Sequence, residues 1–564
     1  MKNHHSGLTK MRKHFISLFL LLFLLQTWFG LQVRGQAYEP VAEKIILFTD
    51  RTMFAGGEKI LFTARLVDES TSGKSPLSQV LYLEIITPDG VHIGGGKYPL
   101  NNLTGRGCIT IPPDIITGTY YLRAYTRFMR NRGPEAYAYI PLKIINPGKP
   151  DVLPGNPGNS TPSAVTGQVN KVYPLDPPTL ELDKPVYSTR DSVRITIQGN
   201  RDTDEPSVLW CLSVVPAGSW SDTFVPWPMA KQVMKEGDFL PETRGISLSG
   251  RLNKPAIVNL SVPGEKECMA VRTDSAGRFL VGLPEYYGNK DLFICPTNEG
   301  GTKMTIRVDN DFCPQPVSLP TPEFDLDPLE KETALRLARN ANVSEFFRKP
   351  VSMEKTIEVQ PKRPFYDHPT EVLYFDKYIQ LPTLEEYFSE LPTPVKVRKK
   401  GGKKYFMFMG TQSGMAIYDP LVLIDWVAVD EVDDILGLPP QSILRIEFVN
   451  APYLKGSMIY GGILSFISRQ GDFAGINLPE SGLFVNYGFY NDESCSSLTE
   501  QPSNDRPDAR NTVFWKPGII LEPGKKAWET FTVPDTPGSY LVLLRGVTEE
   551  GVIIQSTATF EVSR

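Results

Sequence analysis

The sequence predicts a mainly β protein that contains several immunoglobulin-like β-sandwiches and one small α/β domain. Three observations lead to this prediction. Short apolar, β-branched runs alternate with turn residues over most of the chain, helical patterns are few, and 564 residues exceed what a single hydrophobic core holds. We therefore expect several domains of roughly 50–200 residues each.

Residues 1–37 have the pattern of a secretory signal peptide, in which basic residues precede an apolar run over 15–25 and small residues follow. The apolar run is shorter than the roughly 20 residues that span a bilayer, which favours cleavage over anchoring. Met11 opens a compact version of the same signal and is an alternative start. We expect an exported protein, which is outer-membrane-associated, periplasmic or at the cell surface.

The charge balance argues against nucleic acid as a partner. The chain has 59 Lys and Arg against 64 Asp and Glu, a formal net charge of −5. Removing the five positive charges of residues 1–37 takes the net charge to −10. Such a chain has no overall field that attracts a polyanion.

Residues 38–147 are predicted to form the first sandwich, and 148–178, which are dense in Pro, Gly, Ser and Asn, a linker. Pro88-Asp89-Gly90 supplies a hairpin turn between two of the strands. The apolar strand patterns of this first domain begin at Lys44, Ile60, Val80 and Thr119.

An internal repeat predicts a split domain. The pattern at 50–60 recurs at 183–193, and the pattern at Pro113 recurs at Pro534, near the C-terminus. Neither 176–216 nor 511–564 has enough strands to close a core alone. We therefore expect these two segments to form one sandwich, whose first part we place within 179–240, with everything between inserted into it.

The predicted insertion begins with another small sandwich over 243–308, in which 273–279 forms a hairpin turn. A helical connector over 309–366 follows, with Asp327 as cap and Pro328 in the first helical turn. The small α/β domain is placed at 367–475, and a linker at 476–510.

A second helix is expected to begin at Thr383, with Glu386 completing a capping box. The acidic run 430–434 has two readings: a calcium loop, or the start of a helix through Ile435 and Leu436. The helix is favoured because the run lacks the glycine and terminal Glu of an EF-hand, while acids suit a helix N-terminus.

Three segments resemble known families. The first sandwich, through 49–60 and 118–130, resembles the second macroglobulin (MG2) domain of bacterial alpha-macroglobulin-like proteins. Residues 245–294 resemble carboxypeptidase-regulatory-like, transthyretin-type domains. Residues 376–471 are similar to the plug domain of TonB-dependent receptors through four sequence blocks, which begin at Ile379, Pro420, Ile443 and Tyr460.

The plug resemblance has two informative departures. The receptors have Gly after the Asp of the second block, whereas Asp425 here precedes Trp426. Only 93 residues follow Gly471, too few for the many-stranded barrel that surrounds a receptor plug. We therefore expect a plug fold used as a soluble module, and not an integral barrel by this chain alone.

The sequence offers little material for catalysis, so we expect no enzyme, no cofactor and no metal site. After the signal only His92 and His368 remain, and Gly94-Gly-Gly-Lys97, which lacks the Ser or Thr of a phosphate loop, is interpreted as a turn. None of the cysteines has the Cys-x-Glu-Gln neighbourhood of macroglobulin thioesters. Six cysteines allow fifteen full pairings, and small buried hydrophobes are the favoured alternative to disulfides.

One candidate binding surface stands out, a basic hairpin tip formed by Arg398, Lys399, Lys400, Lys403 and Lys404. It could meet an anionic glycan or a lipid headgroup. The simpler interpretation is a solvated edge that discourages strand aggregation.

These observations predict a non-enzymatic exported envelope protein that binds, scaffolds or assists an outer-membrane complex through its sandwich and plug-like modules. A protein partner in or outside the outer membrane is expected, and a glycan is a further candidate. The alternative is an alpha-macroglobulin-like protease-interacting protein that lacks the thioester.

Overall fold

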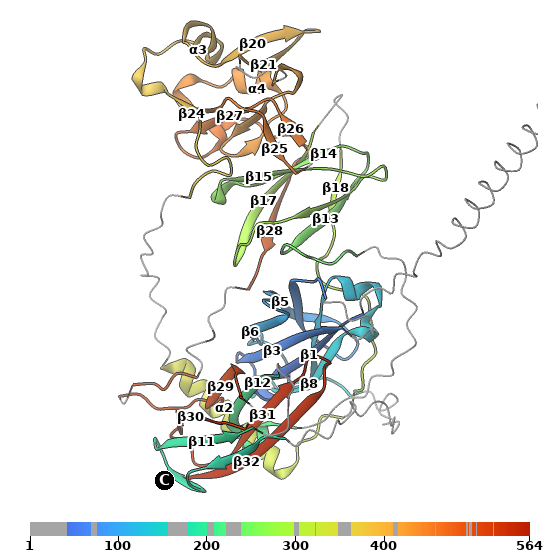
Figure 1. Ribbon diagram of the computed structural model, residues 1–564, viewed down its shortest axis with the longest axis vertical. Helices are drawn as coiled ribbons and strands as arrows, with labels where there is room; N and C mark the ends of the chain where they lie inside the picture. The colour runs from blue at the N-terminus through green and yellow to red at the C-terminus, as the bar shows by residue number, and fades with distance from the viewer. Residues whose placement is uncertain are drawn as a thin grey trace, which may run out of the picture.

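The computed structural model describes residues 42–68, 76–155, 177–199, 208–221, 239–297, 304–321, 323–347, 362–409, 415–456, 458–491, 495, 499–503, 505–522 and 524–564. The predicted signal peptide and most of the 148–178 linker lie outside these residues. The prediction of a mainly β fold with several packed sheet pairs is confirmed (Figure 1). No helix among the described residues is long and apolar enough to cross a membrane.

The first sandwich packs a three-stranded sheet, in the order β1-β3-β6, against a five-stranded sheet, in the order β2-β8-β7-β4-β5. The turn at Pro88-Asp89-Gly90 joins β4 to β5, as predicted. Gly94 to Lys97, however, form part of strand β5 and not a turn, because they pair with β4 through residues such as Leu83. The strands are β1 (Glu43–Thr49), β2 (Met53–Ala55), β3 (Lys59–Asp68), β4 (Val80–Ile86), β5 (His92–Pro99), β6 (Thr104–Thr110), β7 (Gly118–Tyr125) and β8 (Ala138–Ile145).

The split sandwich is built from the two segments that the internal repeat pairs. Its sheets have the orders β10-β32-β31-β12-β29 and β30-β11-β9. Strand β12 lies between two C-terminal strands, so the residues that it pairs with in the sheet are more than 290 positions away. The strands are β9 (Thr179–Leu182), β10 (Val186–Ser188), β11 (Ser192–Gln198), β12 (Leu209–Pro216), β29 (Phe514–Ile519), β30 (Lys526–Thr532), β31 (Gly538–Val547) and β32 (Ile553–Ser563).

The small sandwich has sheets β16-β13-β18 and β15-β14-β17-β28, which correct two sequence expectations. Strand β28 lies within 476–510, which was predicted to be a linker. It is a strand there because it pairs antiparallel with β17. The turn at 273–277 joins β15 to β16, which lie in different sheets and form no hairpin. The strands are β13 (Ser247–Leu252), β14 (Ile257–Val262), β15 (Glu267–Arg272), β16 (Arg278–Gly282), β17 (Asn289–Pro296), β18 (Ile306–Val308) and β28 (Leu483–Gly488).

The α/β unit has a mixed five-stranded sheet, β19-β24-β27-β22-β23, with two short helices and two separate hairpins. Strands β22 and β27 are parallel, and the other pairs are antiparallel. The strands are β19 (Glu371–Tyr374), β20 (Val395–Lys400), β21 (Lys403–Phe408), β22 (Leu421–Ile424), β23 (Val427–Ala428), β24 (Ile443–Val449), β25 (Tyr453–Lys455), β26 (Met458–Tyr460) and β27 (Ile463–Ser468), and the helices are α3 (Leu384–Glu390) and α4 (Val432–Leu436).

The helix start signals hold locally. Helix α2 (Pro328–Phe346) begins at Asp327, and Asp327 and Glu330 form a reciprocal capping box. Thr383 caps α3 by accepting a hydrogen bond from the Glu386 backbone N–H at 3.3 Å. The described residues show no return hydrogen bond from the Glu386 side chain, so the predicted capping box is only half formed there. The acidic run ends in α4, which supports the helical interpretation of that run.

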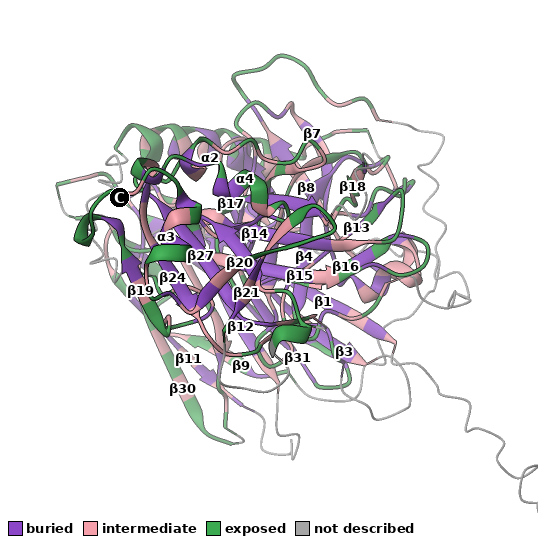
Figure 2. Ribbon diagram, turned by 90° about the horizontal axis from the view of Figure 1, so that it is seen from above, coloured by how far each residue is buried: buried purple, intermediate pink, exposed green. Residues whose placement is uncertain are grey.

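The units are joined by buried apolar contacts. The first and small sandwiches share one contiguous core, and Phe48 of the first sandwich packs in a cluster with Val547 of the split sandwich. Leu337 of α2 packs with Met53, and Cys268 of the small sandwich packs with the sheet of the α/β unit. In Figure 2 the buried residues run through these strands, while exposed residues dominate the outer helices and loops. This arrangement fastens neighbouring units to one another.

Candidate functional site

The basic hairpin predicted from the sequence is present, with β20 and β21 joined by Gly401 and Gly402. Both glycines have positive φ, 59° and 87°, which a two-residue turn between antiparallel strands requires. A Cβ added at either glycine would meet nothing within 4 Å. The turn therefore points into open solvent.

The alternation of the two strands decides which basic residues face the body of the α/β unit. Lys399 lies opposite Lys404, on the same strand face as the buried Val395 and Phe406 and the partly buried Val397. Lys400, opposite Lys403, and Arg398 lie on the other face. The tip therefore carries positive charge on both faces.

Acidic residues of the neighbouring helices pair with two of the five predicted site residues. Lys404 Nζ lies 2.7 Å from Glu385 of α3, and Lys403 Nζ lies 3.1 Å from Glu431, which precedes α4. The hydrogen bond to Glu385 raises the pKa of Lys404. Arg398, Lys399 and Lys400 are exposed and have no ion pair among the described residues. The sequence places the five basic residues next to one another. Only the fold shows that two of them are paired with acids, and we call the three that pair with no acid in the described part of the chain the open cations.

A second polar site, which the sequence analysis missed, lies between the first and small sandwiches. The ammonium group of Lys97 is buried there, pairs with Asp311 and lies 3.9 Å from the ring centre of Tyr487. Lys97 also donates a hydrogen bond of 2.6 Å to the Gly488 carbonyl of β28. Burial lowers the pKa of Lys97, and the Asp311 carboxylate opposes that shift.

Glu242 extends this buried junction. Its carboxylate accepts hydrogen bonds from the Tyr82 hydroxyl at 3.0 Å and from the Ser247 backbone N–H at 2.7 Å. Burial raises the pKa of Glu242 from 4.5 to about 7, and the Ser247 hydrogen bond and the Arg127 charge oppose the shift. No local sequence motif announces this cluster, because its members come from strands far apart in the chain.

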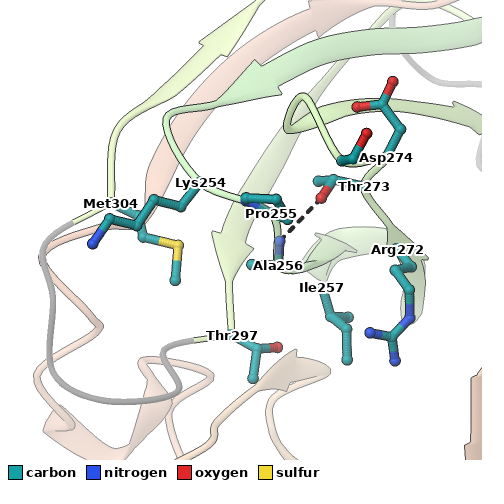
Figure 3. Close-up of a pocket in the computed structure, with 10 residues that line it drawn as sticks. Lys254, Pro255, Ala256, Ile257, Arg272, Thr273, Asp274, Thr297 and Met304 are labelled. Carbon is teal, nitrogen blue, oxygen red and sulfur yellow. Dashed lines mark hydrogen bonds between the residues drawn. The ribbon is translucent and has the colours of Figure 1, made fainter.

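Shallow hollows occur near the end of β17 in the small sandwich, one at Thr297 and one at Pro296. One, of about 320 Å³, is lined by Lys254, Arg272 and Thr273, with Asp274 turned away from the Arg272 guanidinium (Figure 3). The Thr273 hydroxyl accepts a hydrogen bond of 3.0 Å from the Ala256 backbone N–H, so it stabilises the turn. A second hollow of about 300 Å³ is lined partly by acidic residues, namely Asp430, Glu431, Asp434 and Glu480.

The described residues bring no metal-binding group together. None of their His, Cys, Asp and Glu side chains form a group of three placed to hold a metal ion. His92 Nδ1 lies 2.9 Å from Glu84, which is itself paired with Arg123 at 2.5 Å, while His368 is exposed on the α/β unit.

The cysteines divide into one disulfide, between Cys108 and Cys495, and four buried free thiols. Burial raises the pKa of Cys211 to about 11 and the pKa values of Cys268 and Cys295 to about 12. These three thiols are therefore protonated at neutral pH and are poor nucleophiles. The preference for small buried hydrophobes holds for four of the six cysteines.

The fold and these sites define a multi-unit β-sandwich protein with a projecting basic hairpin. No family model and no curated protein matches the chain. Among solved structures, a mutant Salmonella alpha-2-macroglobulin is 11% identical with a TM-score of 0.24, and native Escherichia coli alpha-2-macroglobulin is 10% identical with a TM-score of 0.23. Each comparison covers 93% of this chain and 40% of that chain, so this chain spans less than half of their length.

Another similar structure is dimeric latent PorU from Porphyromonas gingivalis, at 11% identity and a TM-score of 0.15. That comparison covers 48% of this chain and 34% of PorU. TM-scores of this size carry no argument about function, which must come from the residues of this chain.

Proposed function

We propose that this protein is a non-enzymatic, exported binding or scaffold protein of a cell envelope, which holds the α/β unit in a fixed position for a partner. In this proposal the first sandwich is MG2-like, the small sandwich is carboxypeptidase-regulatory-like and the α/β unit is plug-like. The observation that carries the proposal is the use of buried polar groups. They tie units together, and Lys97, Asp311 and Tyr487 also line a hollow of about 370 Å³ at the junction of the first and small sandwiches.

The junction of the first and small sandwiches gives the strongest support. Lys97 is held there by Asp311 and by the Gly488 carbonyl, and Asn491 donates a hydrogen bond of 3.0 Å to the Cys108 carbonyl. The disulfide between Cys108 and Cys495 closes the same connection. A disulfide also suits the oxidising compartment that follows export.

Several ties attach the α/β unit to the small sandwich, and three of them illustrate the attachment. Lys455 Nζ of β25 lies 2.6 Å from Glu267, and the Lys266 ammonium lies 5.3 Å from the ring centre of Trp426. Buried Val427 packs with Phe293 of β17. An accessory that presents a plug-like module needs such a fixed attachment.

The strained turn at Asp425 and Trp426 supports the plug-like assignment. Both residues have positive φ, 44° and 66°, in the two-residue turn between β22 and β23. The receptors have glycine at the second position, which is the residue type that this backbone conformation favours. In this proposal tryptophan occupies a backbone conformation that favours glycine.

Protease shaving of intact cells, followed by crosslinking and mass spectrometry of the mature chain, tests the proposal. We expect crosslinks from the sandwiches or the α/β unit to an envelope or extracellular partner that is not a protease. Recovery of proteases alone would favour the macroglobulin-like alternative and overturn the proposal. Turnover of any small substrate by the purified chain would also contradict it.

A further inference from the structure

The three open cations of the basic hairpin form a local exception on an acidic protein. Arg398, Lys399 and Lys400 are consecutive and exposed, next to a glycine turn that projects into solvent. The chain as a whole has a formal charge of −5. An anionic partner is repelled by most of this protein and attracted at the tip, since exposed charges act over about one Debye length, roughly 8–10 Å.

The acids near the tip are already engaged with other lysines. Glu385 pairs with Lys404, and Glu431 pairs with Lys403. Asp433 lies 3.9 Å from the Lys404 ammonium. The neighbouring acids thus face Lys403 and Lys404, and no ion pair among the described residues engages the three open cations.

Exposed apolar side chains lie in the loop before α3, the helix whose Glu385 contacts Lys404. Ile379 is 89% exposed and Tyr378 is 44% exposed, in the loop that leads into α3. The loop folds back beside the helix, because the Leu381 backbone N–H donates a hydrogen bond of 3.2 Å to the Tyr387 hydroxyl. Glu385 in the first turn of α3 contacts Lys404, and Figure 1 draws α3, β20 and β21 at the same end of the α/β unit.

We propose that this end of the α/β unit docks on a lipid surface that carries anionic phosphate headgroups. The open cations attract the headgroups, and Ile379 inserts its aliphatic side chain at the boundary of the acyl chains. A lipid surface is favoured over a soluble polyanion because acyl chains can bury the exposed Ile379 side chain, whereas a hydrated polyanion offers it no apolar contact. The inference rests on the proposed binding role and names the chemistry of one partner.

The test uses the full mature chain and sedimentation with vesicles of phosphatidylglycerol and phosphatidylethanolamine in equal parts. The variant Arg398→Gln/Lys399→Gln/Lys400→Gln is expected to weaken binding roughly tenfold or more, given the usual contribution of each basic residue near an anionic membrane. The matched control, Lys516→Gln/Lys525→Gln/Lys526→Gln, changes the net charge equally on the split sandwich and should bind as the unmodified chain does. Equal loss in both variants would overturn the proposal.

A second variant is expected to move affinity in the opposite direction. Glu385→Gln/Glu431→Gln removes the acids that hold Lys404 and Lys403, so we expect tighter vesicle binding and a steeper loss of binding with salt. No change in affinity or in salt dependence would contradict the proposed role of the tip. An unchanged thermal unfolding midpoint identifies variants that remain folded.

Ile379→Ser separates a lipid from a glycan. We expect weaker binding to the anionic vesicles and unchanged, weak binding to soluble polygalacturonate. Strong binding to polygalacturonate that is insensitive to Ile379 would overturn the lipid proposal in favour of an acidic polysaccharide. The inference fails if the unmodified chain does not bind the vesicles. If the triple tip variant also keeps its protein crosslinks in cells, the proposed scaffold function still stands.

Discussion

Cys108 in β6 of the first sandwich is disulfide-bonded to Cys495, which lies after β28 of the small sandwich and 387 residues later in the sequence. The bond fixes the returning chain at the place where the Asn491 side chain also contacts the first sandwich. It therefore helps to hold β28 in the small sandwich while the chain continues to the split sandwich.

Replacing Cys108 and Cys495 together with serine should lower the stability of this junction by about 2–4 kcal/mol, the usual range for a native disulfide. We expect a lower first transition in calorimetry and faster proteolysis between residues 489 and 510. The control is Cys313→Ser, which removes a free buried thiol and no crosslink. An unchanged proteolysis pattern in the double variant would show that noncovalent contacts alone hold the segment.

Removal of Arg51 should be strongly destabilising. Its guanidinium is buried, lies 2.8 Å from Glu58 and donates a hydrogen bond of 3.2 Å to the Thr512 hydroxyl of the C-terminal segment. Arg51→Met leaves the carboxylates of Glu58 and the fully buried Asp50 without their cation, which costs about 3–5 kcal/mol. Urea unfolding measures this loss, and the exposed pair of Arg278 with Asp274 provides the control.

The control variant, Arg278→Met, should change the unfolding midpoint little, because exposed ion pairs contribute about 0–1 kcal/mol. If both variants lower the midpoint equally, the buried network has no special role in joining the first and split sandwiches.

Glu242 should make the junction less stable as the pH rises through neutrality. Burial raises its pKa in the folded protein to about 7 from 4.5, so the folded state holds this proton more tightly than the unfolded state does. The stabilising contribution is complete below about pH 4.5 and is lost as the pH rises through 7, a change of roughly 3 kcal/mol.

Thermal unfolding between pH 5.5 and 8.5, at about half-unit steps, measures the Glu242 effect against Glu242→Gln. The charged and polar groups that influence the carboxylate, Tyr82, Arg127 and Asp311, remain in both proteins. We expect the difference between the two unfolding curves to grow in favour of the glutamine variant as the pH rises from 5.5 to about 7, and to level off above pH 7. Parallel curves would exclude Glu242 as the titrating group.

Asp425 should matter more to the α/β unit than the strained Trp426 beside it. The Asp425 carboxylate accepts hydrogen bonds from the Ser468 backbone N–H, the Ser468 hydroxyl and the Phe473 backbone N–H, at 2.6–2.9 Å. Asp425→Ala leaves these buried donors unpaired and should cost about 2–4 kcal/mol.

Trp426→Gly should change stability less, because relief of the positive φ at residue 426 offsets the packing that the indole loses against Lys266. Unfolding of both variants, followed by hydrogen exchange of β27, compares the two effects. A larger loss in Trp426→Gly than in Asp425→Ala would contradict this ranking.

A chain that ends at residue 510 should fail to fold the split sandwich. Strand β12 would lose both neighbours, β29 and β31, and β11 would lose β30. We expect rapid proteolysis of 177–221 in the shortened chain, while the first sandwich persists. Resistance equal to that of the full chain would refute the dependence of the two segments on each other.

The sequence by itself determined the local elements. Strand alternation, the turn at Pro88-Asp89-Gly90 and the caps at Asp327 and Thr383 depend on neighbours within a few residues, so composition and spacing predict them. The internal repeat also predicted a long-range pairing, because two patterns of the first sandwich recur, one in each segment of the split sandwich. The basic hairpin was also predictable, since both strands and the turn are contiguous.

Only the tertiary structure decided which distant groups meet. In the structure β28 is a strand within a predicted linker, and Cys495 is the disulfide partner of Cys108. Lys97 is buried in a strand, where the sequence predicted a turn. The fold also divides the basic tip into paired and open cations. The first three outcomes depend on contacts between segments far apart in the sequence, whereas the tip depends on pairs 19 and 28 residues apart. The energies of all these contacts come from shared burial and charge pairing, and no local pattern records them.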